Sequence, residues 1–158
     1  MKKIFVAILL ASVTLGCHTI TTSVEIHAPA SEVWRVIVDT HAYPEWNSFL
    51  KVEGDLAVGN TLHITVSPPE KDPMSFDPKV LRFSNKELLW RGRFFMPGLF
   101  TGDHHFYLEE KSAGVVVFHQ NEDFSGILVP FVDLEATKLG FENMNRELKD
   151  RVEKNKSR

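Results

Sequence analysis

A change of hydrophobic period near Pro130 limits the folds open to this chain more than any other feature. Up to Phe124, short segments alternate apolar and polar residues between glycine, asparagine and proline, which is typical of strands. After Pro130, Leu134, Phe141 and Leu148 recur every seven residues, so the period becomes that of an amphipathic helix. Because no strand alternates with a long helix, the pattern predicts an α+β fold, in which an antiparallel sheet precedes one long C-terminal helix.

Seven strands and two short helices are expected before that long helix. The strands are predicted over Ile20–His27, Leu50–Asp55, Thr61–Ser67, Phe76–Ser84, Glu87–Phe94, Asp103–Glu110 and Val115–Phe124. Between the first two strands, apolar residues at helical spacing predict a helix over Ser31–Asp39. The segment His41–Asn47 predicts a second short helix or turn, because proline suits a first helical turn.

Composition excludes several functional classes. With 158 residues, the chain is long enough for one domain with a substantial core. Its net charge of −3 provides no basic surface for nucleic acid, and its single cysteine allows neither an intramolecular disulfide nor a cysteine-based zinc site. We find no His-Glu-x-x-His motif and no glycine-rich phosphate loop. We therefore expect no nucleic-acid partner, no metal and no cofactor.

The N-terminus has the pattern of an export signal. Lys2 and Lys3 precede the apolar run Ile4–Leu15, which is too short to span a bilayer comfortably as a helix. The only cysteine follows in Val13-Thr14-Leu15-Gly16-Cys17, which resembles a bacterial lipobox. The resemblance implies cleavage before Cys17 and acylation of its thiol, and two or three acyl chains anchor a protein stably. An ordinary cleaved signal with an incidental cysteine, or an uncleaved N-terminus, remain the alternatives.

This interpretation divides the chain into three parts. Residues 1–16 are the predicted lipoprotein signal, residues 17–19 the anchor and a short linker, and residues 20–155 the folded domain. The domain is therefore expected outside the cytoplasm, in the cell envelope and close to its membrane. In Gram-negative lipoproteins, the resemblance implies that Asp after the cysteine favours inner-membrane retention. His18 stands there instead, which favours the outer membrane.

The order of elements and several motifs resemble the SRPBCC, or START-like, superfamily, most closely its polyketide cyclase/dehydrase and lipid-transport group. The similar residues are the opening Val24–Trp34, followed by Asp39, Tyr43–Asn47, Phe49, Gly54, Val58-Gly59, Leu89-Trp90, Gly98–Phe100, His104-Xaa-Phe106, Glu122-Xaa-Phe124-Xaa-Gly126 and Gly140-Phe141-Xaa-Xaa-Met144-Asn145. The resemblance implies a helix-grip fold, in which a curved seven-stranded antiparallel sheet wraps around the long C-terminal helix and encloses an apolar cavity.

Twelve phenylalanines agree with such an aromatic interior. Strand alternation and helical phase nominate ligand-contact residues on the cavity wall: Trp34, Phe49, Trp90, Phe94, Phe106, Phe118, Phe124, Phe141, Met144 and Leu148, with Asn145 a candidate for orienting a polar end of the ligand. The alternative for each aromatic residue is ordinary packed core, which excludes voids.

His104 and Glu122 are the candidate chemical pair. Ser112-Ala113-Gly114 fits a three-residue hairpin loop with glycine in the left-handed conformation. If Lys111 pairs with Val115, the register places His104 directly opposite Glu122. An imidazole beside a carboxylate in a poorly solvated pocket acts as a general acid or base. Alternatively, the two polar groups satisfy each other near the cavity mouth.

The segment Phe94–Phe100 is unusually apolar for a loop between strands. Three interpretations stay open: a lid on the cavity, a membrane contact beside the anchor, or closure of the end of the core.

Taken together, these patterns predict a lipid-anchored domain that binds a hydrophobic small molecule or lipid in an internal cavity. A cyclase/dehydratase-type enzyme that uses His104 and Glu122 is one alternative, and a cavity-free interaction domain of the envelope is another. The sequence does not determine the ligand or the oligomeric state.

Overall fold

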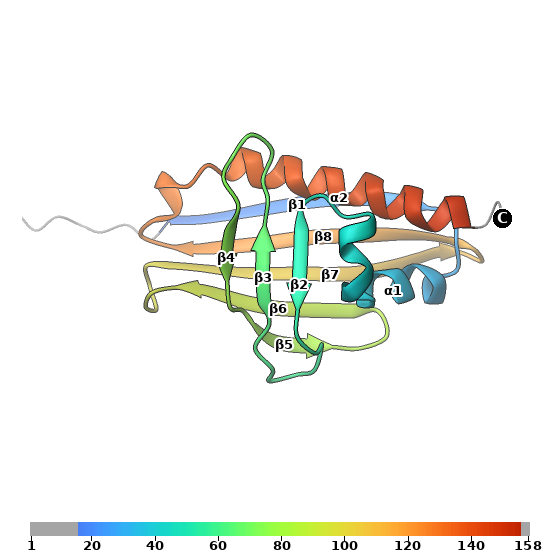
Figure 1. Ribbon diagram of the computed structural model, residues 1–158, viewed down its shortest axis with the longest axis horizontal. Helices are drawn as coiled ribbons and strands as arrows, with labels where there is room; N and C mark the ends of the chain where they lie inside the picture. Colours follow the sequence, from blue (N-terminus) through green and yellow to red (C-terminus); the bar gives the residue numbers. More distant parts are fainter. Residues whose placement is uncertain (1–15, 156–158) are drawn as a thin grey trace, which may run out of the picture.

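A five-stranded antiparallel sheet is the largest element of the computed structural model, which describes residues 16–155 (Figure 1). Its strands, in spatial order, are β1 (Gly16–Ile26), β8 (Val115–Gly126), β7 (Phe100–Ser112), β6 (Glu87–Phe94) and β5 (Lys79–Phe83). Alternating burial along β6, β7 and β8 shows that one face of this sheet points inward, as their sequence pattern predicts.

A second antiparallel sheet has three strands, β2 (Leu50–Glu53), β3 (His63–Val66) and β4 (Met74–Phe76). The structure therefore corrects the strand count from seven in one sheet to eight in two sheets. The strand predicted over Phe76–Ser84 is divided into β4 and β5 at Asp77-Pro78. Proline has no N–H to donate to a ladder, so the pairing stops there and the chain passes from one sheet to the other.

The helices match the predicted order. α1 (Ala30–Val38) is followed by η1, a 3₁₀ helix over Thr40–Glu45, and α2 (Leu134–Asn155) runs along the sheet beside β1 (Figure 1). α1 buries Val33, Trp34 and Ile37, which share one helical face. The α+β helix-grip layout predicted from the sequence is confirmed.

Gly140 brings α2 close to the segment before β2. A Cβ atom at position 140 would collide with the ring of Phe49. Without that atom, Phe49 packs edge-on against Phe141, with ring centroids 5.5 Å apart. The glycine thus allows the long helix to pack closely against Phe49, the residue before β2.

β1 begins at Gly16, four residues earlier than predicted. Residues 17–19, expected to be anchor and linker, pair with the end of β8, where Cys17 lies opposite Ser125. Thr19 Oγ1 also donates a hydrogen bond of 2.7 Å to Asp123 Oδ1. Cys17 is exposed at the start of this strand. The rest of the predicted signal, residues 1–15, lies outside the described residues.

Candidate ligand site

His104 and Glu122 lie directly opposite each other on β7 and β8, as predicted. The turn differs in detail from the predicted loop: Ser112 pairs with Val115, and Lys111 lies within a bulge. Gly114 adopts the expected left-handed conformation, with φ of 79°. The bulge adds one residue to β7, so the ladder beyond it keeps the predicted register.

The two side chains form a polar pair in which His104 is buried and Glu122 is partly buried. His104 Nδ1 lies 3.3 Å from Glu122 Oε2, a distance at the long end for a hydrogen bond, and the side chains are 5% and 13% exposed. Gly102 makes room for the carboxylate, because a Cβ at that position would lie 2.5 Å from Glu122 Oε1. Since a carboxylate only accepts, Nδ1 carries the shared hydrogen; in the neutral tautomer of the ring, that leaves the lone pair on Nε2.

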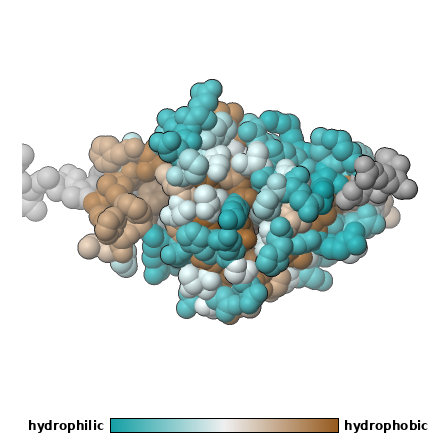
Figure 2. Space-filling view, in the orientation of Figure 1, coloured by the Kyte–Doolittle hydropathy of each residue, from teal (hydrophilic) through white to brown (hydrophobic). Residues whose placement is uncertain are grey.

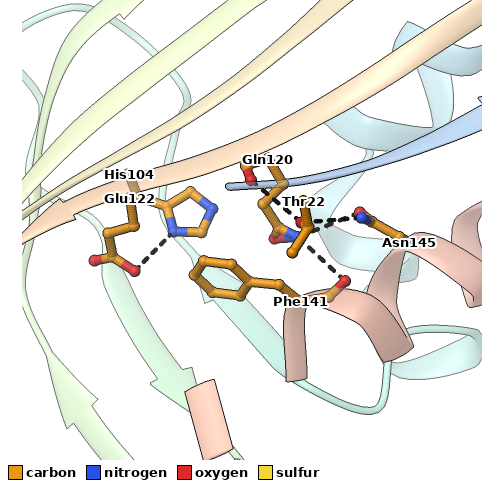
Figure 3. Close-up of polar contacts among 6 residues, drawn as sticks. All are labelled: Thr22, His104, Gln120, Glu122, Phe141 and Asn145. Atoms are coloured by element: carbon orange, nitrogen blue, oxygen red, sulfur yellow. Dashed lines mark hydrogen bonds and ion pairs between the residues drawn. The ribbon is translucent and has the colours of Figure 1, made fainter. Parts of the chain in front are cut away.

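Three aromatic rings enclose the imidazole of His104. Trp90 stacks on it with centroids 5.1 Å apart, while Phe106 and Phe141 meet it edge-on at 4.5 and 4.9 Å. Within residues 16–155, the buried Nε2 atom has no hydrogen-bond partner. His104 therefore presents one unpaired polar atom to an apolar interior, with Phe141 of α2 beside it (Figure 3).

A second polar group, which the sequence analysis did not nominate, lies beside His104. Gln120 is fully buried on β8, and its Nε2 donates to the backbone oxygen of Phe141 and to Asn145 Oδ1, both at 3.4 Å. Asn145 Nδ2 donates to Thr22 Oγ1 at 3.0 Å, and Thr22 donates to the Gln120 backbone oxygen at 3.2 Å. Figure 3 shows this chain of bonds, which joins β1, β8 and α2.

The network also determines which atom of Gln120 is unpaired. Its two acceptors, on Phe141 and Asn145, orient the amide nitrogen toward α2. Oε1 is then left buried without a hydrogen-bond partner among the described residues. A signal for this residue was present in the sequence, because Gln120 is in phase with the inward-facing Phe118.

Ten of the eleven predicted ligand-contact residues point into the interior, each less than 10% exposed: Trp34, Phe49, Trp90, Phe106, Phe118, Phe124, Phe141, Met144, Asn145 and Leu148. The apolar ones pack against one another in the core. Phe94 is the exception, because it is 54% exposed. Alternation places it in phase with Trp90, but β6 runs past the core after Gly92 and its last two residues are solvent-exposed.

A separate surface pocket of about 280 Å³ lies between α1, η1 and α2. It is lined by Arg35, Val36, Asp39, Ala42, Trp46 and Arg151. None of the predicted ligand-contact residues lines it, and Arg151 is already paired with Glu45 at 2.6 Å. In the part of the chain that the structure describes, no three His, Cys, Asp or Glu side chains lie together as a metal-ligand set.

The family model for polyketide cyclase/dehydrase and lipid-transport proteins matches residues 18–154. The chain belongs to this family. No curated protein matches the sequence.

Several solved structures share the fold. A START superfamily protein from Mycobacterium smegmatis is 21% identical with a TM-score of 0.68, covering 87% of this chain and 98% of its own. A norcoclaurine synthase point mutant from Thalictrum flavum, in complex with a transition-state analogue, is 16% identical with a TM-score of 0.68, covering 92% and 99%. A hypothetical protein from Helicobacter pylori is 14% identical with a TM-score of 0.70, covering 85% and 88%. At these identities the likeness concerns the fold alone.

Proposed function

We propose that this family member binds a hydrophobic small molecule or lipid between its sheet and α2, with His104 and Gln120 contacting the polar end of the ligand. The observation that supports this most is that two buried atoms of an aromatic interior, His104 Nε2 and Gln120 Oε1, have no hydrogen-bond partner within residues 16–155. A buried polar atom without a partner costs about 1–3 kcal/mol. Ligand sites in proteins are mostly apolar with a few placed polar groups, and this interior has that composition.

The geometry also favours a chemical class for the ligand. In the neutral tautomer that directs Nδ1–H at Glu122, His104 offers an acceptor at Nε2, and Gln120 offers a second acceptor at Oε1. A ligand end that carries a hydroxyl or amine would donate to such groups. An ester or ether end has no hydrogen to donate and would leave both atoms unpaired.

A fluorescence titration of the full chain with the apolar dye N-phenyl-1-naphthylamine tests the apolar part of the site. Competition by a long-chain alcohol and by its methyl ether then tests the polar part. We expect the alcohol to displace the dye about tenfold better than the ether, which corresponds to about 1.4 kcal/mol. Gln120→Leu and His104→Phe should remove that preference.

His105→Gln is the matched control, because His105 is the neighbour of His104 on the opposite face of β7. It should leave both the dye affinity and the preference for the alcohol unchanged. A chain that does not bind the dye, or a preference that survives Gln120→Leu, would contradict the proposal.

A second candidate, a cyclase/dehydratase-type enzyme, is favoured by one observation: Glu122 orients the His104 ring and leaves Nε2 free to take a proton. His104→Gln retains a polar side chain but removes the base. For an enzyme, a molecule that co-purifies with H104Q should be converted when wild-type chain is added. For a carrier, the same molecule should be recovered unchanged.

Anchoring in the cell envelope is part of the same proposal. It is supported by the lipobox-like segment before Cys17 and by the exposure of Cys17 at the start of β1. Metabolic labelling with an alkyne-tagged fatty acid should label the wild-type chain and leave Cys17→Ser unlabelled. Fractionation of a Gram-negative host should place the labelled chain in the outer membrane.

A further inference from the structure

One end of the molecule exposes large apolar side chains to water. Phe94, the last residue of β6, is 54% exposed, and Phe95 and Met96 in the loop that follows are 87% and 60% exposed. After β8, Phe131 is 83% exposed. We call the segments Phe94–Phe100 and Ile127–Val132 together the apolar end. Figure 2 shows apolar residues gathered at one end of the molecule, in contrast to the largely hydrophilic surface elsewhere in this view.

Backbone hydrogen bonds join the two segments into a single surface. Ile127 N donates to Gly98 O, and Leu128 N donates to Leu99 O, both at 3.0 Å. Gly126 permits this approach, because a Cβ there would lie 2.3 Å from the backbone oxygen of Leu99, and its φ is 136°. The apolar side chains are therefore held on a hydrogen-bonded frame.

The backbone conformation of Phe95 is a second unusual feature of the apolar end. Its φ is 62°, a left-handed conformation that bulky side chains rarely adopt. The two segments of the apolar end contain no charged residue, although charged residues are 25% of the chain. Contiguous exposed apolar surface of this kind marks an interaction site.

The start of β1 lies at the same end. Gly16 pairs with Gly126, a Cβ at Gly16 would lie 2.9 Å from the ring of Pro130, and Cys17 pairs with Ser125. The proposed acylation site, Cys17, thus lies at the same end of the domain as the exposed phenylalanines. Because the proposed anchor is at this end, the observations favour a lipid bilayer over a second protein as the partner of the apolar end.

We propose that the apolar end inserts into the interfacial layer of the membrane that holds the anchor, with Phe95 and Phe131 as the deepest side chains. Apolar contact drives the insertion, because the net charge of −3 gives no general attraction to anionic lipids. Among residues 16–155, no helix is long and apolar enough to cross a bilayer. The insertion also orients the domain, with the C-terminal end of α2 away from the lipid (Figure 1).

Depth-dependent quenching tests the proposal. The full chain, isolated from the membranes of producing cells, is reconstituted into vesicles of phosphatidylethanolamine and phosphatidylglycerol that contain phosphatidylcholine brominated on its acyl chains. Phe95→Trp reports on the apolar end. Val58→Trp is the matched control, because Val58 is 63% exposed in the loop between β2 and β3, away from this end (Figure 1). The native tryptophans Trp34, Trp46 and Trp90 supply the background that is subtracted.

We expect brominated lipid to quench the added emission of F95W at least twofold more than that of V58W. Replacing Phe131 with Ser in F95W should reduce the quenching. Equal quenching of F95W and V58W would overturn the proposal, because the anchor would then hold the domain without contact by its apolar end. Blue-shifted but unquenched emission from F95W would also overturn it, since a protein surface would then cover the phenylalanines.

This inference uses the proposed anchor but not the proposed ligand, so the two fail separately. Dye binding to the interior, measured on F95W and V58W, should equal that of the wild-type chain whatever the quenching shows. Absence of dye binding to the wild-type chain would contradict the ligand proposal. The membrane proposal would still be tested by the quenching result.

Discussion

The interior around His104 and the apolar end depart from ordinary packing in opposite ways: the interior buries polar atoms, and the apolar end exposes aromatic rings. In the aromatic interior, two buried polar atoms lack a hydrogen-bond partner in the described part of the chain. At the apolar end, the rings of Phe95 and Phe131 are exposed at the surface of the domain. The exposed rings lack the favourable free energy of apolar burial, and the buried polar atoms lack that of a hydrogen bond. The comparison teaches that the departures from ordinary packing, more than the packed core itself, indicate where this chain meets other molecules.

The largest expected contrast between the two regions is in stability. Phe141→Ala removes a ring that contacts both Phe49 and His104, so we expect the free energy of unfolding to fall by about 3–5 kcal/mol. Phe131→Ala removes an 83% exposed ring and should change it by less than about 0.5 kcal/mol. Urea unfolding of both variants measures the difference. Similar losses would show that the apolar end is part of the folding core.

A second test concerns the contact between α2 and Phe49. Gly140→Ala should strengthen the helix by its intrinsic propensity, but the added methyl collides with the Phe49 ring. We expect the collision to dominate, with a net loss of about 1–3 kcal/mol in the free energy of unfolding. Leu139→Ala, at a half-exposed position on the same helix, is the control and should cost less than about 1 kcal/mol. A stabilised G140A would mean that the interior has space beside α2.

A third test separates Glu122 from His104 without altering either residue. In Gly102→Ala, the new methyl takes the space of Glu122 Oε1, and the flexible carboxylate can move aside at a cost of less than about 1 kcal/mol. The hydrogen bond to Nδ1 should then be lost, which shifts the ¹⁵N resonances of the His104 ring. The ring resonances of His105, on the other face, serve as the control. An unchanged His104 spectrum would show that Glu122 does not orient the ring.

The smallest expected effect is a pH dependence at His105. Burial lowers the pKa of this imidazole below its ordinary value, and the carboxylate of Glu87, 2.8 Å away, offsets part of that shift. Just below the ordinary pKa, the unfolded chain therefore binds more protons than the folded chain. The free energy of unfolding should fall as the pH is lowered through this window, and fall less in His105→Gln. A larger fall of the free energy of unfolding in H105Q would contradict a lowered pKa for His105.

Local rules predicted much of the fold. Periodicity alone located the long helix and the inward face of β7 and β8, and turn chemistry placed His104 opposite Glu122. That register was correct although the loop was not, because the bulge at Lys111 compensates for the shorter turn. The sequence-based errors lie where tertiary structure decides the outcome. Pro78 divides one predicted strand between two sheets, and Phe94 lies beyond the end of the core.

The polar interior was only half predicted. His104, Glu122 and Asn145 were nominated from the sequence, but Gln120 and Thr22 were not, although both alternate in phase with buried residues. Their contribution depends on α2 crossing β1 and β8 so that Asn145 reaches both. A hydrogen-bond network among three elements that are distant in sequence depends on how those elements pack. Local sequence patterns do not predict that packing.

Native mass spectrometry with solvent extraction tests the central claim most directly. The full chain would be purified in mild detergent from its own envelope fraction, beside Gln120→Leu. We predict one stoichiometric, non-covalent hydrophobic molecule with a hydroxyl or amine on the wild-type chain, and a clear loss of it from Q120L. A wild-type chain that carries only its covalent anchor would contradict the account and favour an interaction domain without a ligand.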